Sequence, residues 1–261
     1  MIKFFQKIRQ NLLSEGNIGK YMKYAFGEII LVVIGILFAL QINNWNENRK
    51  NRNQERVLLT NIQNDISLDT LDFGFNRMVH QKALENEVLL LRLLNKDPNI
   101  NPDSINFLDA LSVQVIVVTH NSSFNNLTYN TPDLISNIDL KKKIDRHYDF
   151  FYTALKEAQN NQSEYNFYSK LLPYYTKHFK RTGIITNFVQ NAGGNKEFYD
   201  YKYDRNALKP VDINVIQNDR EFAVALSEVI FLRSALLSMY DEAHSRIKTL
   251  HDDIETELNK K

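Results

Sequence analysis

The feature that most constrains this chain is an apolar run near its amino terminus, residues 25–45, which reads AFGEIILVVIGILFALQINNW. As a helix, these 21 residues would be roughly 31 Å long, enough to cross a hydrocarbon core of about 30 Å. Twelve of them are Phe, Ile, Leu or Val, which together favour insertion by about 4–7 kcal/mol. Glu28 is the only charge, and near the end of the run it costs less than the roughly 3 kcal/mol of a central carboxylate. The run therefore predicts a single transmembrane helix, with a buried core helix as the alternative.

A cleaved signal peptide would also carry an apolar core of this kind. However, the residues after Leu40 offer no small-x-small cleavage site, and the leader before residue 25 is long. The sequence favours an uncleaved anchor. Within the leader, residues 1–16 predict a basic amphipathic helix lying in the plane of an anionic membrane surface. Its apolar and basic faces are formed by Met1, Phe4, Phe5, Ile8 and Leu12 on one side and Lys3, Lys7 and Arg9 on the other. An ordinary solvated positive flank is the alternative.

The orientation of the span is only weakly marked. Residues 1–24 carry five Lys and Arg, and the twenty residues after Trp45 carry four, so the positive-inside rule barely separates the two ends. The absence of cysteine suits an oxidising compartment. We predict a cytoplasmic N-terminus with the large domain, residues 46–261, on the other side of the membrane.

Four residues of the span are candidates for contacts with lipid or with a partner helix. Glu28 is an intramembrane carboxylate. Gly35 and Ala39 have the small-xxx-small spacing that permits close helix approach, and Trp45 ends the run.

The same residues resemble the N-terminal signature of an uncharacterised family of Bacteroidota membrane proteins, catalogued as domain of unknown function 6090. The resemblance lies in residues 24–29, 32–37 and 39–47 and in the basic opening Met1–Phe5 with Ile8 and Arg9. Residues 123–127 and 134–137 loosely resemble the family's central region, although Asn130-Thr131-Pro132 stands where the family usually has a Ser-Gly step. The resemblance implies a bacterial membrane protein and brings no activity and no catalytic residues.

Beyond the span, the apolar periodicity predicts an all-α protein, in which the transmembrane helix continues into an elongated antiparallel bundle. The first helix should continue without a break to a turn at residues 95–99, along an apolar stripe that includes Leu71 and Val88. A short helix should follow an N-cap at Asp103.

Two further long helices are expected. One covers residues 139–172 and is kinked or ended by Pro173, and one starts at Asn218, with Glu221 in capping-box spacing. Residues 192–206 should form a loop. By propensity residues 113–119 form a strand, but the only partners on offer, residues 184–189 and 211–216, are weak.

Composition and motifs exclude several classes of function. Lys and Arg total 32 against 31 Asp and Glu, a net charge of +1 that argues against nucleic acid as a partner. Without cysteine, thiol catalysis and Cys-ligated zinc are excluded. His244 and His251 would lie about 10 Å apart along a helix, too far to share one metal ion. Asp241 and His244 could form a rim ion pair, and the other four histidines look isolated. We expect no cofactor, no metal, no catalytic residues and hence no enzyme.

Aromatic residues alternate with charged ones in the loop around Tyr199, Tyr201 and Tyr203. These three rings are candidates for binding a peptide or glycan, unless they simply pack on the bundle. Two functions remain open. The first is a membrane-anchored interaction or scaffold protein of the cell envelope, with a protein partner or a second copy of the chain beside the bilayer. The second is an extracytoplasmic, sensor-like ligand-binding module acting through a partner. An uninterrupted apolar core would favour the first, and a buried polar site the second.

Overall fold

A computed structural model of the chain describes residues 18–182 and 208–260. The leader 1–16 and the three loop tyrosines Tyr199, Tyr201 and Tyr203 lie outside these residues, as do the candidate strand 184–189 and the loop 192–206. The chain divides into two compact units, Met1–Arg56 and Val57–Lys261.

Helix α2, Ile18–Leu94, confirms that the apolar run continues without a break into the following residues. It ends at the expected turn. There Lys96 adopts a left-handed conformation (φ 60°), and the Lys96 and Asp97 amides bond back to the carbonyls of Leu93 and Arg92. This pair of bonds is a Schellman motif, which satisfies carbonyls that the helix end would otherwise leave free.

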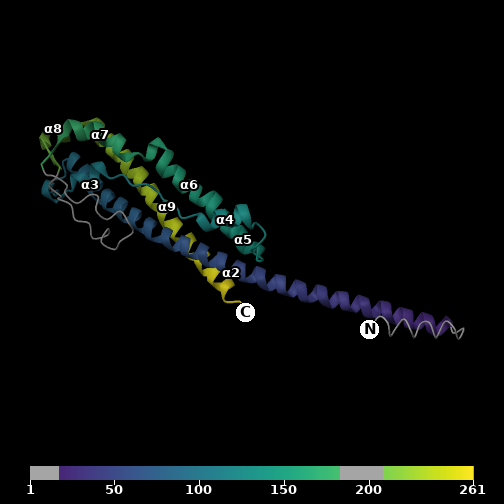
Figure 1. Ribbon diagram of the computed structural model, residues 1–261. Helices are drawn as coiled ribbons and strands as arrows, with labels where there is room; N and C mark the ends of the chain where they lie inside the picture. The colour runs from purple at the N-terminus through teal and green to yellow at the C-terminus, as the bar shows by residue number, and fades with distance from the viewer. Residues whose placement is uncertain (1–17, 183–207, 261) are drawn as a thin grey trace. The chain divides into compact units, whose positions relative to one another are not determined.

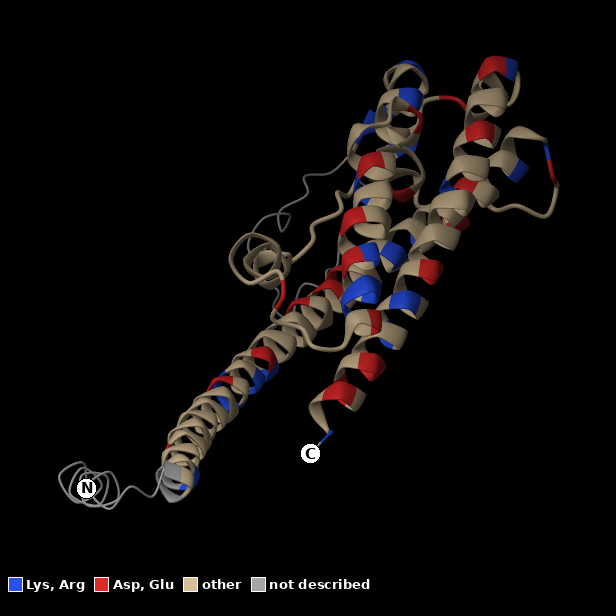
Figure 2. Cartoon of the chain, turned by 90° about the vertical axis from the view of Figure 1, so that its right-hand side faces the viewer, with Lys and Arg blue, Asp and Glu red and all other residues tan. Residues whose placement is uncertain are grey.

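In the first unit, α2 exposes its apolar side chains. Of the most apolar window, 0% is buried, and Leu31, for example, is 64% exposed. In Figure 2 the N-terminal part of α2 is almost entirely tan, and charged residues gather further along it. The helix is therefore long and apolar enough to cross a membrane, and its apolar surface is not covered by the described chain. By length and composition α9, Arg220–Leu258, would also qualify, but 33% of its most apolar window is buried within the structure.

The second unit is a helical bundle, built on the rest of α2 and on α9 (Figure 1). The two helices run antiparallel. Arg77 of α2 bonds to Asp241 of α9, Glu87 to Arg233, and the Leu93 carbonyl accepts from Gln217, just before α9 begins. The predicted all-α antiparallel bundle is thus confirmed. The remaining helical elements are η1 Pro102–Ser104, α3 Phe107–Ser112, α4 Ser122–Asn130, α5 Ile138–Asp145, η2 Arg146–Tyr152, α6 Thr153–Lys156, η3 Glu157–Asn161, η4 Ser163–Tyr165, α7 Phe167–His178 and α8 Ile213–Gln217.

The core follows heptad spacing on both long helices, with side chains buried alternately four and three residues apart. On α2 these are Ile62, Ile66, Asp69, Phe73, Asn76, His80, Ala83, Glu87, Leu90 and Leu94. On α9 they are Phe222, Leu226, Val229, Arg233, Leu236, Tyr240, Ala243, Ile247, Leu250, Ile254 and Glu257. Several of these positions are polar. The apolar stripe predicted for α2 was therefore wrong in its middle, where Leu71 and Val88 are exposed.

The predicted helix over residues 139–172 is not one regular element. Residues 138–161 are helical throughout, but η2 and η3 are π-helical. A break at Gln162–Asn166 then precedes α7, whose N-cap Asn166 accepts from the Ser169 amide. Pro173 lies inside α7, which continues to His178, so the prediction that Pro173 kinks or ends the 139–172 helix was placed on the wrong element.

Two predicted caps are displaced. Asp219, one residue after Asn218, caps α9 by accepting from the Phe222 amide. In the same way Asn106, not Asp103, caps α3, accepting from the amides of Leu108 and Asp109.

Residues 113–120, all of which the structure describes, form neither helix nor strand. Side-chain amides hold their backbone instead. Asn160 bonds to both the N–H and the C=O of Val117, Gln159 donates to the Val115 carbonyl, and Asn76 donates to the Ile116 carbonyl. These residues form a strap between α2 and η3. The two-stranded sheet that the structure does describe pairs β1, Phe179–Arg181, with β2, Leu208–Pro210, in antiparallel register.

Candidate functional site

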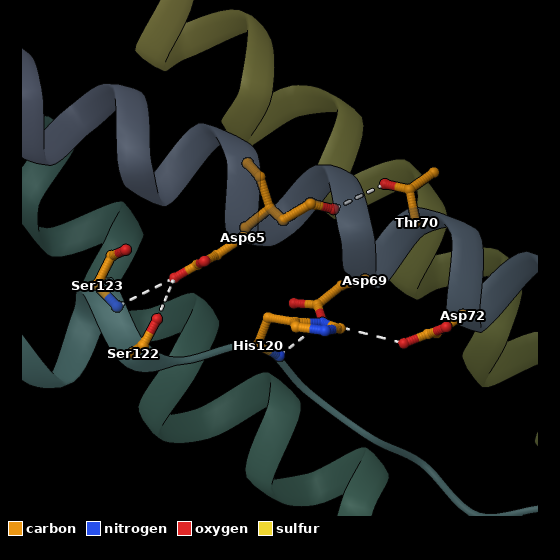
Figure 3. Close-up of polar contacts among 8 residues, drawn as sticks. Asp65, Asp69, Thr70, Asp72, His120, Ser122 and Ser123 are labelled. Atoms are coloured by element: carbon orange, nitrogen blue, oxygen red, sulfur yellow. Dashed lines mark hydrogen bonds and ion pairs between the residues drawn. The ribbon is translucent and has the colours of Figure 1, made fainter. Parts of the chain in front are cut away.

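Three carboxylates of α2 are placed on one side of the helix by their spacing. Asp65, Asp69 and Asp72 are four and three residues apart, and the strap and the start of α4 pass beside them (Figure 3). Asp69 occupies a heptad core position and is fully buried, whereas Asp72 is partly exposed. Sequence analysis missed this cluster because its partners come from residues 120–123.

Asp69 holds His120 at the end of the strap. One oxygen, Oδ1, accepts from the His120 backbone amide at 2.7 Å and from the ring nitrogen Nδ1 at 2.8 Å. An ionised carboxylate can only accept, so Nδ1 carries a proton and donates it to Asp69. The His120 side chain is 36% exposed, and Asp72 Oδ2 lies 3.9 Å from Nδ1. The arrangement is an Asp–His pair in which the carboxylate is buried and the imidazole is partly exposed (Figure 3).

Asp65 accepts hydrogen bonds from the N-terminus of α4. Its Oδ2 accepts from the Ser123 amide at 3.0 Å and from Ser122 Oγ at 3.3 Å. Asn121, the residue in the N-cap position, makes no such bond with its side chain in the described structure. A carboxylate from another helix thus supplies the cap and the negative charge that a helix N-terminus favours.

A second layer of polar groups lies behind Asp69. His147, Tyr148 and Tyr152 come from η2, where π-helical winding brings residues five apart onto one face. The ring centroids of His147 and Tyr152 are accordingly 4.2 Å apart, and those of Tyr148 and Tyr152 are 5.2 Å apart. All three side chains are buried.

This layer is short of hydrogen bonds. Asp69 Oδ2, Tyr148 OH, Tyr152 OH and His147 Nε2 are buried and have no hydrogen-bond partner among the described residues. Tyr152 lies close enough to interact with the Asp69 carboxylate, yet neither Asp69 Oδ2 nor the Tyr152 hydroxyl forms a bond of normal geometry. Burial raises the pKa of Asp69, although His120 and Tyr152 oppose the shift. Burial also raises the pKa of Tyr152 and lowers that of His147 to about 4. Buried polar groups are normally paired, so unpaired atoms on Asp69 and on three neighbouring residues of η2 mark a candidate site.

A buried ion pair joins α2 to α9 further along the bundle. Arg233 Nε lies 3.0 and 2.9 Å from the two Glu87 oxygens, and its NH1 lies 2.6 Å from His80 Nδ1. The guanidinium also stacks over Phe167 of α7, with Cζ 4.3 Å from the ring centroid. Burial raises the pKa of Glu87, although the positive charge and hydrogen bond of Arg233 oppose this shift. Burial and the charge of Arg233 both lower the pKa of His80, to about 3. Through these contacts Arg233 links α9 to α2 and to α7.

The other residues singled out in the sequence do not lie at this site and do not form a second one in the described structure. In the first unit, Glu28 is half-buried, whereas Gly35, Ala39 and Trp45 are exposed. A side chain at Gly35 would meet nothing within 4 Å, and the Arg49 guanidinium lies 5.9 Å from the Trp45 ring. In the second unit, Asp241 pairs with Arg77 rather than with His244. His251, Asp252 and Glu255 have potential ligand atoms within 4.8 Å of one another, but this group lies on the surface of α9.

The histidines that looked isolated in sequence each have a defined setting. His80 and His120 bond to Arg233 and Asp69, and His147 packs on Tyr152. His178 bonds through Nε2 to Asp219 Oδ2 at 2.7 Å. Burial alone would raise the pKa of Asp219, but hydrogen bonds from Lys177, His178 and the Phe222 amide hold it well below its usual value.

Fold and site together define a helical protein with one fully uncovered apolar stretch and a polar, partly unpaired bundle core. Residues 28–97 match the model of a family of unknown function (DUF6090), in agreement with the resemblance seen in the sequence. No curated protein and no solved structure matches the chain.

The buried His147 predicts a loss of stability in mild acid. In the folded protein the pKa of His147 is about 4, against 6.5 for the ordinary side chain. Between these values the unfolded chain binds more protons, so the free energy of unfolding falls as the pH drops through this window. From pH 6.5 to pH 4.5 the loss is roughly 2 kcal/mol for this residue. Chemical unfolding of the full chain in detergent at several pH values measures it. His147→Gln should flatten the dependence, and His244→Gln, at an exposed position, should not; equal slopes for all three proteins would contradict the assignment.

Proposed function

We propose that this chain is a single-pass membrane-anchored helical protein that acts by binding a protein partner or a second copy of itself, and not by catalysis. One observation carries the proposal. The most apolar window of α2 is entirely uncovered, yet the same helix carries the first core residues of the bundle, beginning at Leu58. Twelve large apolar side chains exposed to water would be strongly unfavourable, whereas a bilayer covers them. The bundle is thereby fixed at a membrane surface.

Binding rather than catalysis is supported by how the titratable groups are used. Arg233 and Glu87 join helices, Asp65 caps α4, and Asp219 caps α9 while holding His178. These are structural roles. For the setting we propose a bacterial inner membrane with a cytoplasmic N-terminus. The family resemblance supports a bacterial membrane, and the five basic residues of the leader against four after the span favour this orientation by one charge.

A second function, ligand binding with a signal passed through a partner, is favoured by the site around Asp69. An uninterrupted apolar core would have favoured a purely scaffolding role, but Asp69, Asn76, His80 and Glu87 interrupt it along one side of α2. The orphaned polar atoms behind Asp69 are the feature that a ligand would use.

The anchor and the partner are tested in one preparation. We expect the full chain to stay in the membrane pellet after a carbonate wash, because of the insertion free energy of residues 25–45. A variant with Ile34→Lys and Leu37→Lys, which adds two central charges, should instead be released. Recovery of the unchanged chain in the wash would contradict the anchor.

The same membranes, treated with a short cross-linker and solubilised in mild detergent, should yield a complex containing a second protein or a second copy. A chain recovered only as an uncross-linked monomer would contradict the binding role.

Protease added to the outer face of the membrane should cut the bundle, and protection until lysis would reverse the orientation.

A further inference from the structure

We propose that the cluster behind His120 binds a monovalent cation, an alkali ion or an ammonium group. The inference deepens the second function above and is independent of the membrane anchor. It begins with the four buried atoms that have no hydrogen-bond partner among the described residues: Asp69 Oδ2, Tyr148 OH, Tyr152 OH and His147 Nε2.

All four atoms can face a positive charge. The carboxylate oxygen can only accept, and a phenolic oxygen can offer its lone pairs. The lowered pKa keeps the His147 ring neutral above about pH 4, so one of its nitrogens has a free lone pair. An anion or an apolar ligand would leave the Asp69 oxygen unsatisfied.

The charged side chains around the cluster are mainly negative, as a cation site requires. Asp65, Asp69 and Asp72 place three carboxylates within about two turns of α2. Their partners are the backbone and side chains of Ser122, Ser123 and His120, and no Lys or Arg forms an ion pair with any of the three in the described part of the chain. The cation that acts on His147 is Arg246, which already bonds to Glu242 and lies over the ring of Phe151. His120 is thus the one side chain that the described residues place in ion-pair distance of these carboxylates.

The ligand set fits a monovalent ion rather than a divalent one. Calcium takes six to eight oxygen ligands, and magnesium takes six and usually keeps several waters, whereas this cluster offers one carboxylate oxygen, two neutral phenols and an imidazole. Further aromatic rings pack against both tyrosines. Phe73 lies 5.5 Å from Tyr152 in an edge contact, and Phe124 stacks on Tyr148 at 4.5 Å. Such rings stabilise ammonium and alkali ions by cation–π attraction. We place the entrance at His120, the partly exposed ring that covers Asp69 Oδ1.

The test is thermal unfolding of the full chain in detergent at constant ionic strength, in NaCl, KCl, NH₄Cl or choline chloride. Choline, a quaternary ammonium ion much larger than the other three cations, serves as the reference salt. At least one of the three small cations should raise Tm by about 2–4 °C over choline. Titration calorimetry of the same cation into protein in choline chloride should then show saturable binding.

Asp69→Asn keeps the size of the side chain and its bond to the His120 amide but removes the charge, and it should abolish both the Tm shift and the heat. Tyr152→Phe provides a second variant in case Asp69→Asn fails to fold, and it should weaken binding at least tenfold. Asp133→Asn and Tyr129→Phe make the same chemical changes at exposed positions and should leave binding intact. Equal melting in all four salts, or an undiminished shift in Asp69→Asn or Tyr152→Phe, would overturn the proposal.

Discussion

Replacing Arg233 with Met should lower the free energy of unfolding by about 3–5 kcal/mol. The guanidinium is the partner of both Glu87 oxygens and of His80 Nδ1, and all three side chains are buried. Removing it leaves a carboxylate in the core without a counter-charge and an imidazole without its donor. The cost comes mainly from the stranded charge, because a buried pair by itself adds little net stability.

That reasoning gives the experiment its controls. Replacing both partners, Arg233→Met with Glu87→Met, should recover most of the loss, because no charge is then left behind. Arg77→Met removes an arginine from the exposed pair with Asp241 on the same two helices and should cost no more than about 1 kcal/mol. Denaturant unfolding of the full chain in detergent measures all three. A double variant as unstable as Arg233→Met alone would show that stacking on Phe167, and not charge, gives Arg233 its importance.

Leu237→Asp should unfold the bundle at room temperature or bring it close to unfolding. Leu237 is buried on α9, and a carboxylate placed there loses its hydration without gaining a partner, at a cost of several kcal/mol. Small domains have only about 5–15 kcal/mol in total. The change should appear as a loss of the cooperative thermal transition in the near-ultraviolet circular dichroism of the full chain.

Phe231→Asp is the matched control, six residues earlier on the same helix. Phe231 is 72% exposed, so the new charge stays in water and the transition should be nearly unchanged. If Phe231→Asp destabilised the protein as strongly as Leu237→Asp, then Phe231 would be covered by something outside the described residues, and α9 would have a partner on that side.

The elements that sequence predicted well are those in which a single physical signal dominates. The length and apolarity of residues 25–45, the absence of a break after Trp45 and the turn before Pro98 together predicted one continuous helix that ends near Leu94, although α2 begins earlier than residue 25, at Ile18. Its buried face was harder to predict. Between residues 69 and 87 four of the buried heptad positions are polar: Asp69, Asn76, His80 and Glu87. Apolar periodicity alone therefore assigned exposed neighbours such as Leu71 to the buried face. An uninterrupted 4–3 spacing that included polar residues would have found the correct face.

The candidate site could not be predicted for a different reason. Asp69 and His120 are 51 residues apart, and His147 and Tyr152, which are five residues apart, lie against one another because η2 is π-helical. Nothing in local composition distinguishes a π-helix from an α-helix, since the difference is one extra residue in each hydrogen-bonded turn, accommodated by tertiary packing. The cap at Asp65 is equally non-local: Asn121 has the side chain that an N-cap requires, but the acid that bonds to α4 comes from α2.

The sequence of the strap makes the chain prone to aggregate before it folds. Residues 113–119 read VQVIVVT, seven uncharged residues of high β propensity without proline or glycine, which is the composition of segments that stack into cross-β aggregates. In the native bundle the amides of Asn76, Gln159 and Asn160 occupy backbone groups that a neighbouring strand would otherwise bond. Asn160 and Gln159 are synthesised some forty residues after the segment they shield. During translation the segment therefore emerges unprotected, and the amides act as gatekeepers against self-association only once η3 has formed.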